Sequence, residues 1–456
     1  MRELRIGFMG VKASVIENEI NIKVFEDSKH LVRELSKNHM VEICEEILID
    51  TLEGQRKFFE INEKWCDARF DLIIVQSVGF GLGIAPVELA ISQKDTHIVL
   101  WALPEPDLRE GVEQKRNSWC GINMHASHLN KIGVKFEYIY GFPDDLELIS
   151  KLKEIIRVFE VIKKLRKSTI GAFGSRVPGY YDSNFDELSL RKALGIRFEF
   201  FDLAQVFSEF SKIKDKEVME TVGMIYPFKK INVDEYIQNS IRLYISIKRL
   251  IQEYNLSALS IKCWPDMENI LNIMPCSVIS RLGDDGIPTA CEGDMLGTVS
   301  MLILNYFNED VTSLMDIYDF DFKRNAFLIF HCGSCPTKMA VNKSVIEHKQ
   351  HSVVSTHVGI VNEFGLKPGK CGILRLREDN IYRNKYKIFF AEGEGLIGPN
   401  LIRGNTLMIK VSVDLNKFIE NIIYNGFEHH WAFGYNINKD MLLKFCDWLN
   451  IETCFS

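Results

Sequence analysis

The chain has 456 residues, too many for one ordinary hydrophobic core, and we expect three domains. Its composition, 46% hydrophobic and 26% charged, is that of a globular protein and argues against extensive disorder. The formal net charge of −7 comes without a dense basic segment, so a nucleic-acid partner is not expected.

Neither secretion nor a membrane location is expected. The N-terminal ten residues contain no apolar run long enough for a signal sequence. The most apolar stretch, residues 72–87, is interrupted by Gln76 and three glycines and falls short of the ~20 apolar residues that a spanning helix needs. The 11 cysteines are scattered and odd in number, which is typical of reduced thiols. We therefore predict a cytoplasmic protein.

The first two thirds of the chain alternate between short apolar runs and helix-like stretches. Residues 4–9, 71–76 and 97–102 are rich in Ile, Val and Leu. A long amphipathic helix is expected over residues 146–167, and strands and helices continue to alternate beyond it. This pattern predicts two doubly wound α/β domains with parallel sheets, residues 1–166 and 167–320.

The pattern changes after residue 320. Strand-like segments follow one another there, separated by Gly, Pro and Asn turns: residues 326–332, 352–361, 372–378, 385–395, 405–413 and 418–426. We predict an antiparallel β-barrel domain over residues 321–456, with a final helix at 439–450.

Residues 261–307 hold two acids at conspicuous positions. Glu268 follows the turn Trp264–Pro265–Asp266, and Asp294 opens an apolar helix 26 positions later. Both are expected at the carboxyl edge of one α/β sheet, where such folds bind ligands. Two converging acids suggest a hard-metal or proton-transfer site. The simpler interpretation of Asp294 is a helix N-cap.

Other candidate residues have simple structural explanations as well. Arg176 lies on a loop after a strand and either contacts an anionic or hydroxylated substrate or is merely solvated. His429 and His430 are consecutive, so on a strand only one of them can face the site. His331, Cys332 and Cys335 offer a zinc or thiol alternative, but a structural zinc would need a second pair of ligands nearby.

Four segments in order resemble the L-fucose isomerase and L-arabinose isomerase family. They are WPDMENILN, ACEGDMLGTVSML, FHCGSCP and GFEHHW, and the similarity covers residues 261–435, with WCGIN agreeing in the N-terminal third. The resemblance implies two α/β domains followed by a barrel domain. It also implies a symmetric homo-oligomer, a trimer or hexamer, with active sites between subunits, and a bound divalent cation, usually Mn²⁺.

The family's metal ligands fall on Glu268, on Glu292 or Asp294, and on His430, with Asp294 our first choice. The implied activity is metal-dependent aldose–ketose isomerisation of a monosaccharide through an enediol, with Glu268 and Asp294 jointly as base and acid. The expected substrate-binding residues are His331, which in the arabinose branch would be a fourth ligand, and Trp264, Arg176 and Glu292.

The sugar stays open among L-fucose, L- or D-arabinose and a C6-sulfonated hexose such as sulfoquinovose. A non-catalytic sugar-binding or regulatory protein on the same scaffold is the alternative to an enzyme.

Overall fold

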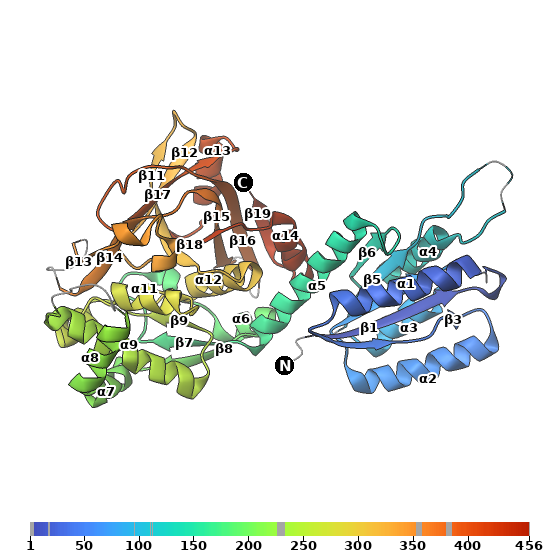
Figure 1. The fold of residues 1–456 in the computed structure, drawn as a ribbon, viewed down its shortest axis with the longest axis horizontal. Coiled ribbons are helices and arrows are strands. Elements are labelled where there is room, and N and C mark those ends of the chain that lie inside the picture. The colour runs from blue at the N-terminus through green and yellow to red at the C-terminus, as the bar shows by residue number, and fades with distance from the viewer. Residues whose placement is uncertain are drawn as a thin grey trace. The chain divides into compact units, whose positions relative to one another are not determined.

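A computed structural model describes residues 4–16, 19–94, 96–109, 111, 113–225, 233–352, 358–379 and 385–455. The chain divides into two compact units, Met1–Lys163 and Lys164–Ser456 (Figure 1). The predicted division into three domains stays a prediction.

Within the described ranges, every helix is too short or too polar to cross a membrane.

The first unit is built on a parallel sheet. Its described strands are β1 (Arg5–Lys12), β2 (Met40–Ile43), β3 (Ile47–Leu48), β4 (Leu72–Ser77), β5 (His97–Ala102) and β6 (Phe136–Tyr140). Their order is β2-β1-β4-β5-β6, with β3 also paired to β1, and every pairing is parallel. The helical segments are η1 (Ser14–Ile16), α1 (Glu19–Leu35), α2 (Leu52–Ala68), α3 (Ile84–Ser92), α4 (Ser118–Lys131) and α5 (Leu146–Lys167).

Helices cover both faces of this sheet. A Cβ on Gly7 of β1 would lie 2.9 Å from Trp65 of α2, and one on Gly10 would lie 2.4 Å from Phe25 of α1. Positions 7 and 10 point to opposite faces of the strand, so the two helices pack on opposite sides. The predicted parallel α/β arrangement is confirmed for this part of the chain.

The second unit begins with another parallel sheet, of order β10-β9-β7-β8. Its strands are β7 (Thr169–Phe173), β8 (Arg197–Phe201), β9 (Ala258–Ile261) and β10 (Thr289–Ala290). The accompanying helical segments are η2 (Tyr181–Ser183), α6 (Glu187–Leu194), α7 (Leu203–Lys212), α8 (Asp215–Ile225), α9 (Glu235–Tyr254), α10 (Asp266–Leu271), α11 (Cys276–Asp284) and α12 (Met295–Asn308). The loops after β7, β9 and β10 leave the carboxyl ends of parallel strands and therefore share one edge.

A nine-stranded sheet completes this unit. Its strands are β11 (Ser313–Asp321), β12 (Ala326–His331), β13 (Glu347–Gln350), β14 (Ile360–Gly365), β15 (Gly369–Glu378), β16 (Tyr386–Gly395), β17 (Asn405–Val411), β18 (His430–Tyr435) and β19 (Glu452–Phe455). The helical segments are η3 (Thr337–Met339), η4 (Lys343–Val345), α13 (Leu415–Tyr424) and α14 (Lys439–Trp448). The strand order is β13-β14-β17-β12-β11-β18-β15-β16-β19, and β16 pairs with β17 as well.

This sheet is mixed, so the predicted antiparallel arrangement is found in most of its pairings but not in all of them. The β14–β17 and β16–β19 pairs are parallel. A parallel neighbour needs a crossover connection, and the chain between β16 and β19 runs through β17, α13, β18 and α14.

The predicted strand at 418–426 was wrong, because α13 occupies most of it. Asp414 caps that helix, and its buried Leu415, Phe418 and Ile422 recur at helical spacing. Part of the predicted strand 352–361, residues 353–357, lies outside the described residues.

Candidate active site

Two of the predicted acids, Glu292 and Asp294, lie in a tight turn between β10 and α12. Glu292 and Gly293 both adopt left-handed backbone conformations, with φ of 61° and 77°. A Cβ on Gly293 would lie 2.7 Å from the Ser175 carbonyl oxygen and 2.8 Å from Arg176 Cα, so this position requires glycine. A glutamate at positive φ is unfavourable, and such residues cluster at functional sites. The turn brings the Glu292 side chain to the histidine at the start of β18.

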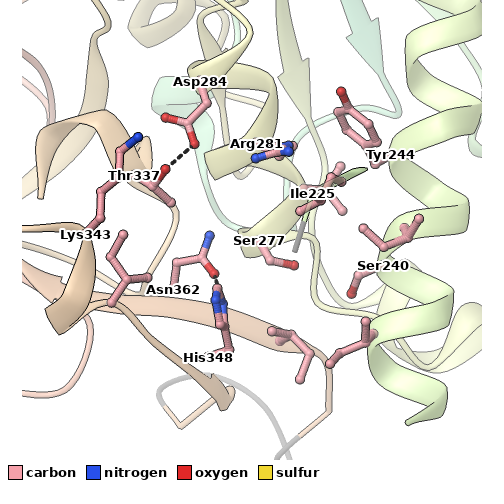
Figure 2. Close-up of a pocket in the computed structure, with 15 residues that line it drawn as sticks. Ile225, Ser240, Tyr244, Ser277, Arg281, Asp284, Thr337, Lys343, His348 and Asn362 are labelled. Carbon is pink, nitrogen blue, oxygen red and sulfur yellow. Dashed lines mark hydrogen bonds between the residues drawn. The ribbon is translucent and has the colours of Figure 1, made fainter. Parts of the chain in front are cut away.

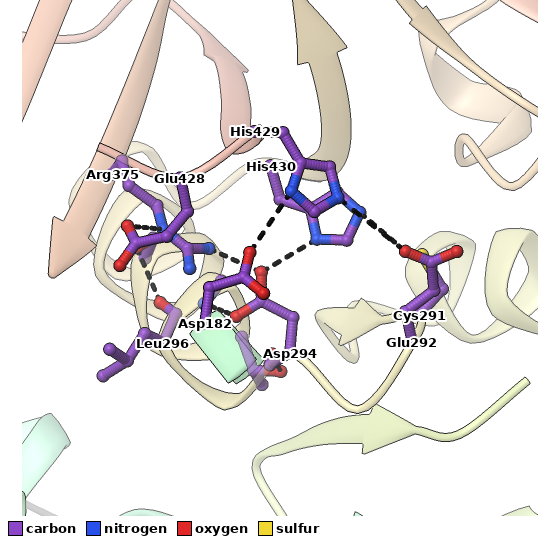
Figure 3. A network of polar contacts seen from close by, with 12 residues as sticks. Asp182, Cys291, Glu292, Asp294, Leu296, Arg375, Glu428, His429 and His430 are labelled. Atoms are coloured by element: carbon purple, nitrogen blue, oxygen red, sulfur yellow. Dashed lines mark hydrogen bonds and ion pairs between the residues drawn. The ribbon is translucent and has the colours of Figure 1, made fainter. Parts of the chain in front are cut away.

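His430 lies between two carboxylates (Figure 3). Its Nδ1 is 3.0 Å from Asp294 Oδ2, and its Nε2 is 3.1 Å from Glu292 Oε2. Burial by itself lowers the pKa of His430, but the hydrogen bonds to Asp294 and Glu292 outweigh burial and raise the pKa to about 10. Likewise, the polar contacts of Glu292 with His429, His430 and Trp264 outweigh burial and hold the pKa of Glu292 well below its usual range.

Both carboxylate oxygens of Asp294 accept hydrogen bonds from the protein. Its Oδ1 accepts the backbone N–H of Gly297 at 2.8 Å, which makes it the N-cap of α12. Its Oδ2 accepts from Arg375 Nη1 at 2.5 Å and from His430. Both Asp294 and Arg375 are buried, with 1% and 0% exposure, and Arg375 is also bonded to Glu428. The helix cap that the sequence suggested is confirmed, and the geometry makes Asp294 the residue that orients His430.

Both adjacent histidines reach the site, so the expectation that only one of them could do so was wrong. β18 begins at His430, so His429 still belongs to the preceding turn, where strand alternation does not apply. His429 Nε2 lies 4.0 Å from Glu292 Oε2, and its Nδ1 is 3.2 Å from Asp182 Oδ2. Glu292, His429 and His430 form one of three groups of described residues whose ligand atoms are close enough to hold a metal ion.

Asp316 is a candidate site residue that the sequence did not indicate. It pairs directly with His430 across β11 and β18. Its Oδ1 lies 3.8 Å from His430 Nε2 and is buried, and among the described residues it has no hydrogen-bond partner. A carboxylate oxygen buried without a donor is unfavourable unless a cation or proton meets it. The only signal in the sequence was one acid among apolar neighbours, Leu314, Met315 and Ile317.

Glu268 lies in the first turn of α10, after the cis peptide bond between Trp264 and Pro265. None of the three groups of potential metal ligands found among the described residues includes it. Its segment nevertheless meets the site, because Trp264 Nε1 donates to Glu292 Oε1 at 3.1 Å. The assignment of Glu268 as ligand and catalytic acid or base stays a prediction.

His331 ends β12 with a defined orientation. Its Nδ1 accepts the backbone N–H of Cys332 at 2.8 Å, so in the neutral ring the proton sits on Nε2. That Nε2 is 3.2 Å from Cys291 Sγ, and the ring lies 6.4 Å from the His430 ring. In this tautomer His331 presents an N–H rather than a lone pair. This favours hydrogen bonding to a substrate hydroxyl over metal ligation.

The two cysteines of the CxxC segment point to different partners. Cys335 Sγ contacts Ser313 Oγ at 3.1 Å, whereas Cys332 Sγ lies 3.6 Å from Cys276 Sγ. Cys332 and Cys335 share none of the groups of potential metal ligands in the described part of the chain. The geometry therefore does not favour the zinc or thiol site of His331, Cys332 and Cys335.

Arg176 borders the turn that carries Glu292, through the contact of its backbone with Gly293. Its guanidinium lies 4.8 Å from the centre of the Tyr181 ring and donates to the Val177 carbonyl at 3.2 Å. It is half-buried, so it is not the fully solvated loop arginine of the simpler interpretation.

A cavity of about 420 Å³ lies elsewhere in the same unit, between α9, α11 and β13 (Figure 2). Its wall is apolar at Ile237 and Ile241 and polar at Arg281, His348 and Asn362. None of the predicted site residues lines it. The carboxylate–histidine cluster is therefore the candidate active site.

These features define a mixed α/β protein with a polar cluster of acids and histidines at the carboxyl edge of a parallel sheet. The sequence model of the family described as "Fucose/sulfoquinovose isomerase, N-terminal domain" matches residues 19–166. The chain is thus related to sugar isomerases, and the resemblance to the fucose isomerase-like family is confirmed.

Individual proteins similar to this chain are also sugar isomerases by name. The chain is 28% identical to the sulfoquinovose isomerase of Priestia aryabhattai, over 84% of this chain and 85% of the relative. It is 24% identical to the sulfoquinovose isomerase of Clostridium sp. (strain MSTE9), over 99% of both chains. It is 20% identical to the L-arabinose isomerase of Shouchella clausii, over 77% of this chain and 76% of that protein.

Proposed function

We propose that this chain is a metal-dependent aldose–ketose isomerase. The observation that carries the proposal is the convergence of Glu292 and Asp316 on Nε2 of His430, at 3.1 and 3.8 Å. Two carboxylates and an imidazole are a donor set that suits Mn²⁺ or a similar divalent cation. A non-catalytic sugar-binding protein would have no need of this set.

Glu292, His429 and His430, whose ligand atoms lie within 4.8 Å of one another, would hold the cation. Asp316, beside His430, and the predicted Glu268 would be further ligands. Asp294 accepts the Nδ1 proton of His430 and so directs the lone pair of Nε2 toward the ion. This replaces our first choice of Asp294 as ligand, because both of its oxygens are already bonded. When bound, the cation polarises the substrate carbonyl and stabilises the negative charge that develops on the sugar oxygens.

While a second proton passes between the two sugar oxygens O1 and O2, the chain's own residues must move one proton between C1 and C2 of the sugar. A carboxylate removes it from one carbon and returns it to the other through an enediol. Of the proposed acid–base pair, Asp294 is too deeply buried and too fully bonded to reach a substrate carbon. We therefore propose Glu268 and Glu292 for proton transfer. His331 Nε2–H and Trp264 orient the substrate and the Glu292 carboxylate.

The substrate that we favour is a C6-sulfonated hexose such as sulfoquinovose. Several relatives over most of the chain are sulfoquinovose isomerases by name. Arg176, beside the Glu292 turn, offers a cation for the sulfonate. The similarity to an L-arabinose isomerase keeps a pentose as the second candidate.

Three features of the whole protein complete the proposal. We infer that β17, β12, β11, β18, β15 and β16, which pair successively in a ring, form the predicted barrel. We propose a homo-oligomer, a trimer or hexamer, with active sites between subunits. A cytoplasmic location is supported by the eleven cysteines, all of which are free thiols in the structure.

Metal removal tests the proposed function. The purified protein is treated with EDTA and ketose formation is measured on sulfoquinovose, L-fucose, L-arabinose and D-arabinose before and after Mn²⁺ is restored. We expect turnover that depends on the metal and is fastest on sulfoquinovose. Turnover without metal would refute the metal requirement, and no turnover on any of the sugars would refute the isomerase.

A further inference from the structure

A second cluster of ligand atoms lies outside the proposed sugar site. Cys276 Sγ, Cys332 Sγ and a ring nitrogen of His351 all lie within 4.8 Å of one another. Cys276 and His351 are buried, with 2% and 0% exposure. Two thiols and one imidazole form a softer donor set than the carboxylates and imidazoles around Glu292.

The spacing of the two sulfur atoms matches a shared ion. With zinc–sulfur bonds of about 2.3 Å, tetrahedral geometry places two sulfurs roughly 3.8 Å apart. The observed Sγ–Sγ distance is 3.6 Å. A disulfide would need the same atoms about 2.05 Å apart, so the present geometry is that of two separate sulfurs.

Each ligand is fixed by its own element. Cys276 is the first residue of α11, after Pro275. Cys332 follows β12, and its backbone N–H is bonded to His331. His351 follows β13, and its backbone N–H donates to the Gly359 carbonyl at 3.2 Å. Three positions held independently by the backbone form a preorganised site, which lowers the entropic cost of binding an ion.

We propose that Cys276, Cys332 and His351 form a second metal site, which binds a zinc-class ion and is distinct from the carboxylate site. Such an ion would join α11 to the loop after β12 and to the segment after β13. It would also steady His331, because the backbone N–H that orients this ring belongs to the ligand Cys332. The fourth coordination position would be filled by water or by a neighbouring side chain.

Metal analysis and cobalt spectroscopy of the full-length protein test this site. The protein is purified under reducing conditions, and its zinc content is measured after dialysis. We expect close to one zinc per chain in the wild type, and its loss in Cys276→Ser and in Cys332→Ser. Cys371→Ser is the matched control, because Cys371 is equally buried but belongs to none of the groups of potential ligands in the described residues; it should keep the zinc.

Cobalt substitution keeps the test valid if a serine variant fails to fold. Co²⁺ bound by Cys276 and Cys332 gives an intense thiolate-to-cobalt absorption in the near ultraviolet, and Mn²⁺ or Co²⁺ at the carboxylate site gives none. A wild-type protein without this absorption and without bound zinc would overturn the proposal. So would a Cys276–Cys332 disulfide in the reduced preparation. Neither readout involves a sugar, so failure here leaves the isomerase proposal standing, and the reverse also holds.

Discussion

Glu292 and Asp294 are two positions apart and both contact His430, yet their surroundings give them different roles. Glu292 is partly exposed and faces side chains of the site: Trp264 donates to it at 3.1 Å, and His430 and His429 lie 3.1 and 4.0 Å away. Asp294 is buried against Arg375 and the first turn of α12. The former is available to an ion or a sugar. Asp294 instead supports His430, which we propose as a ligand of the ion.

Paired amide substitutions separate these roles. Glu292→Gln should abolish Mn²⁺ binding at micromolar metal with little loss of stability. Asp294→Asn should keep the helix cap but weaken the hydrogen bond to His430, and lower Mn²⁺ affinity by about 10- to 100-fold. Asp294→Asn also removes the negative charge that Asp294 places beside the buried guanidinium of Arg375. This loss should lower the free energy of unfolding by roughly 3 kcal/mol.

Calorimetric titration with Mn²⁺ and urea unfolding measure the two effects of these substitutions. If Asp294→Asn abolished binding while Glu292→Gln retained it, Asp294 would be the ligand after all. Asp319→Asn, on the same strand as Asp316, serves as a control that should change neither quantity.

Arg176 should discriminate sulfonated from ordinary sugars. A charge-assisted hydrogen bond is worth about 1.5–3 kcal/mol, so Arg176→Ala should raise KM for sulfoquinovose by roughly 10- to 100-fold. Arg176→Lys keeps the charge but loses the planar fork, and an intermediate value is expected. Steady-state kinetics with L-fucose or L-arabinose provide the control, because those sugars carry no sulfonate. An equal rise in KM for every sugar would show that the substitution merely disturbs the loop.

Site residues could be predicted from the sequence where they belong to a short motif. The segment CEGD and the pair His429–His430 pointed to the cluster, and the cap at Asp294 followed from its place before an apolar helix. The choice between Glu292 and Asp294 did not follow, because it depends on Arg375, a partner 81 positions away. Asp316 was missed for the same reason, since its register with His430 is a property of the folded sheet.

Elements were predictable where one interaction dominates. Parallel strands buried on both faces, such as β4 and β5, give apolar runs that local sequence alone reveals. Residues 418–426 were predicted as a strand because their isoleucines suit a strand. The N-cap of the helix that forms there, Asp414, lies upstream of this segment. The parallel partners in the large sheet depend on pairing between distant strands, which no local pattern encodes.

The contacts of Glu160 on α5 should make the stability of the protein depend on pH. Glu160 on α5 accepts from His39 Nε2 at 3.0 Å and from Arg157 Nη1 at 2.8 Å. Burial alone would raise the pKa of Glu160, but these hydrogen bonds outweigh it and lower the pKa. A carboxyl whose pKa is lowered by folding stabilises the protein above its unfolded-state pKa, and this contribution is lost as the pH falls through the folded-state pKa.

Glu160→Gln should therefore lower the free energy of unfolding by about 1–3 kcal/mol at pH 7, and the difference from wild type should shrink below about pH 4. Urea unfolding of the full chain at several pH values measures it. Glu147→Gln, in the exposed first turn of the same helix, is the control. A difference that stayed constant down to pH 3 would mean that the carboxyl charge of Glu160 contributes nothing.

At the scale of the whole molecule, the residues of the candidate site all belong to the unit Lys164–Ser456. The family model of the isomerase N-terminal domain, in contrast, matches residues 19–166, most of which belong to the other unit, Met1–Lys163. The family resemblance implies active sites between subunits, so a neighbouring copy would supply part of the site. The number of copies in the active species then becomes a functional property.

Light scattering should accordingly give a native mass of three or six times the 52.6 kDa chain mass. Activity per chain should fall on dilution together with dissociation, because an isolated chain would lack the part of the site that its neighbour supplies. The Co²⁺ absorption of the Cys276–Cys332 site should persist through the same dilution, since all of its ligands lie in one chain. A monomer with full activity per chain at every concentration would refute the shared site, and would mean that a single chain binds and isomerises the sugar by itself.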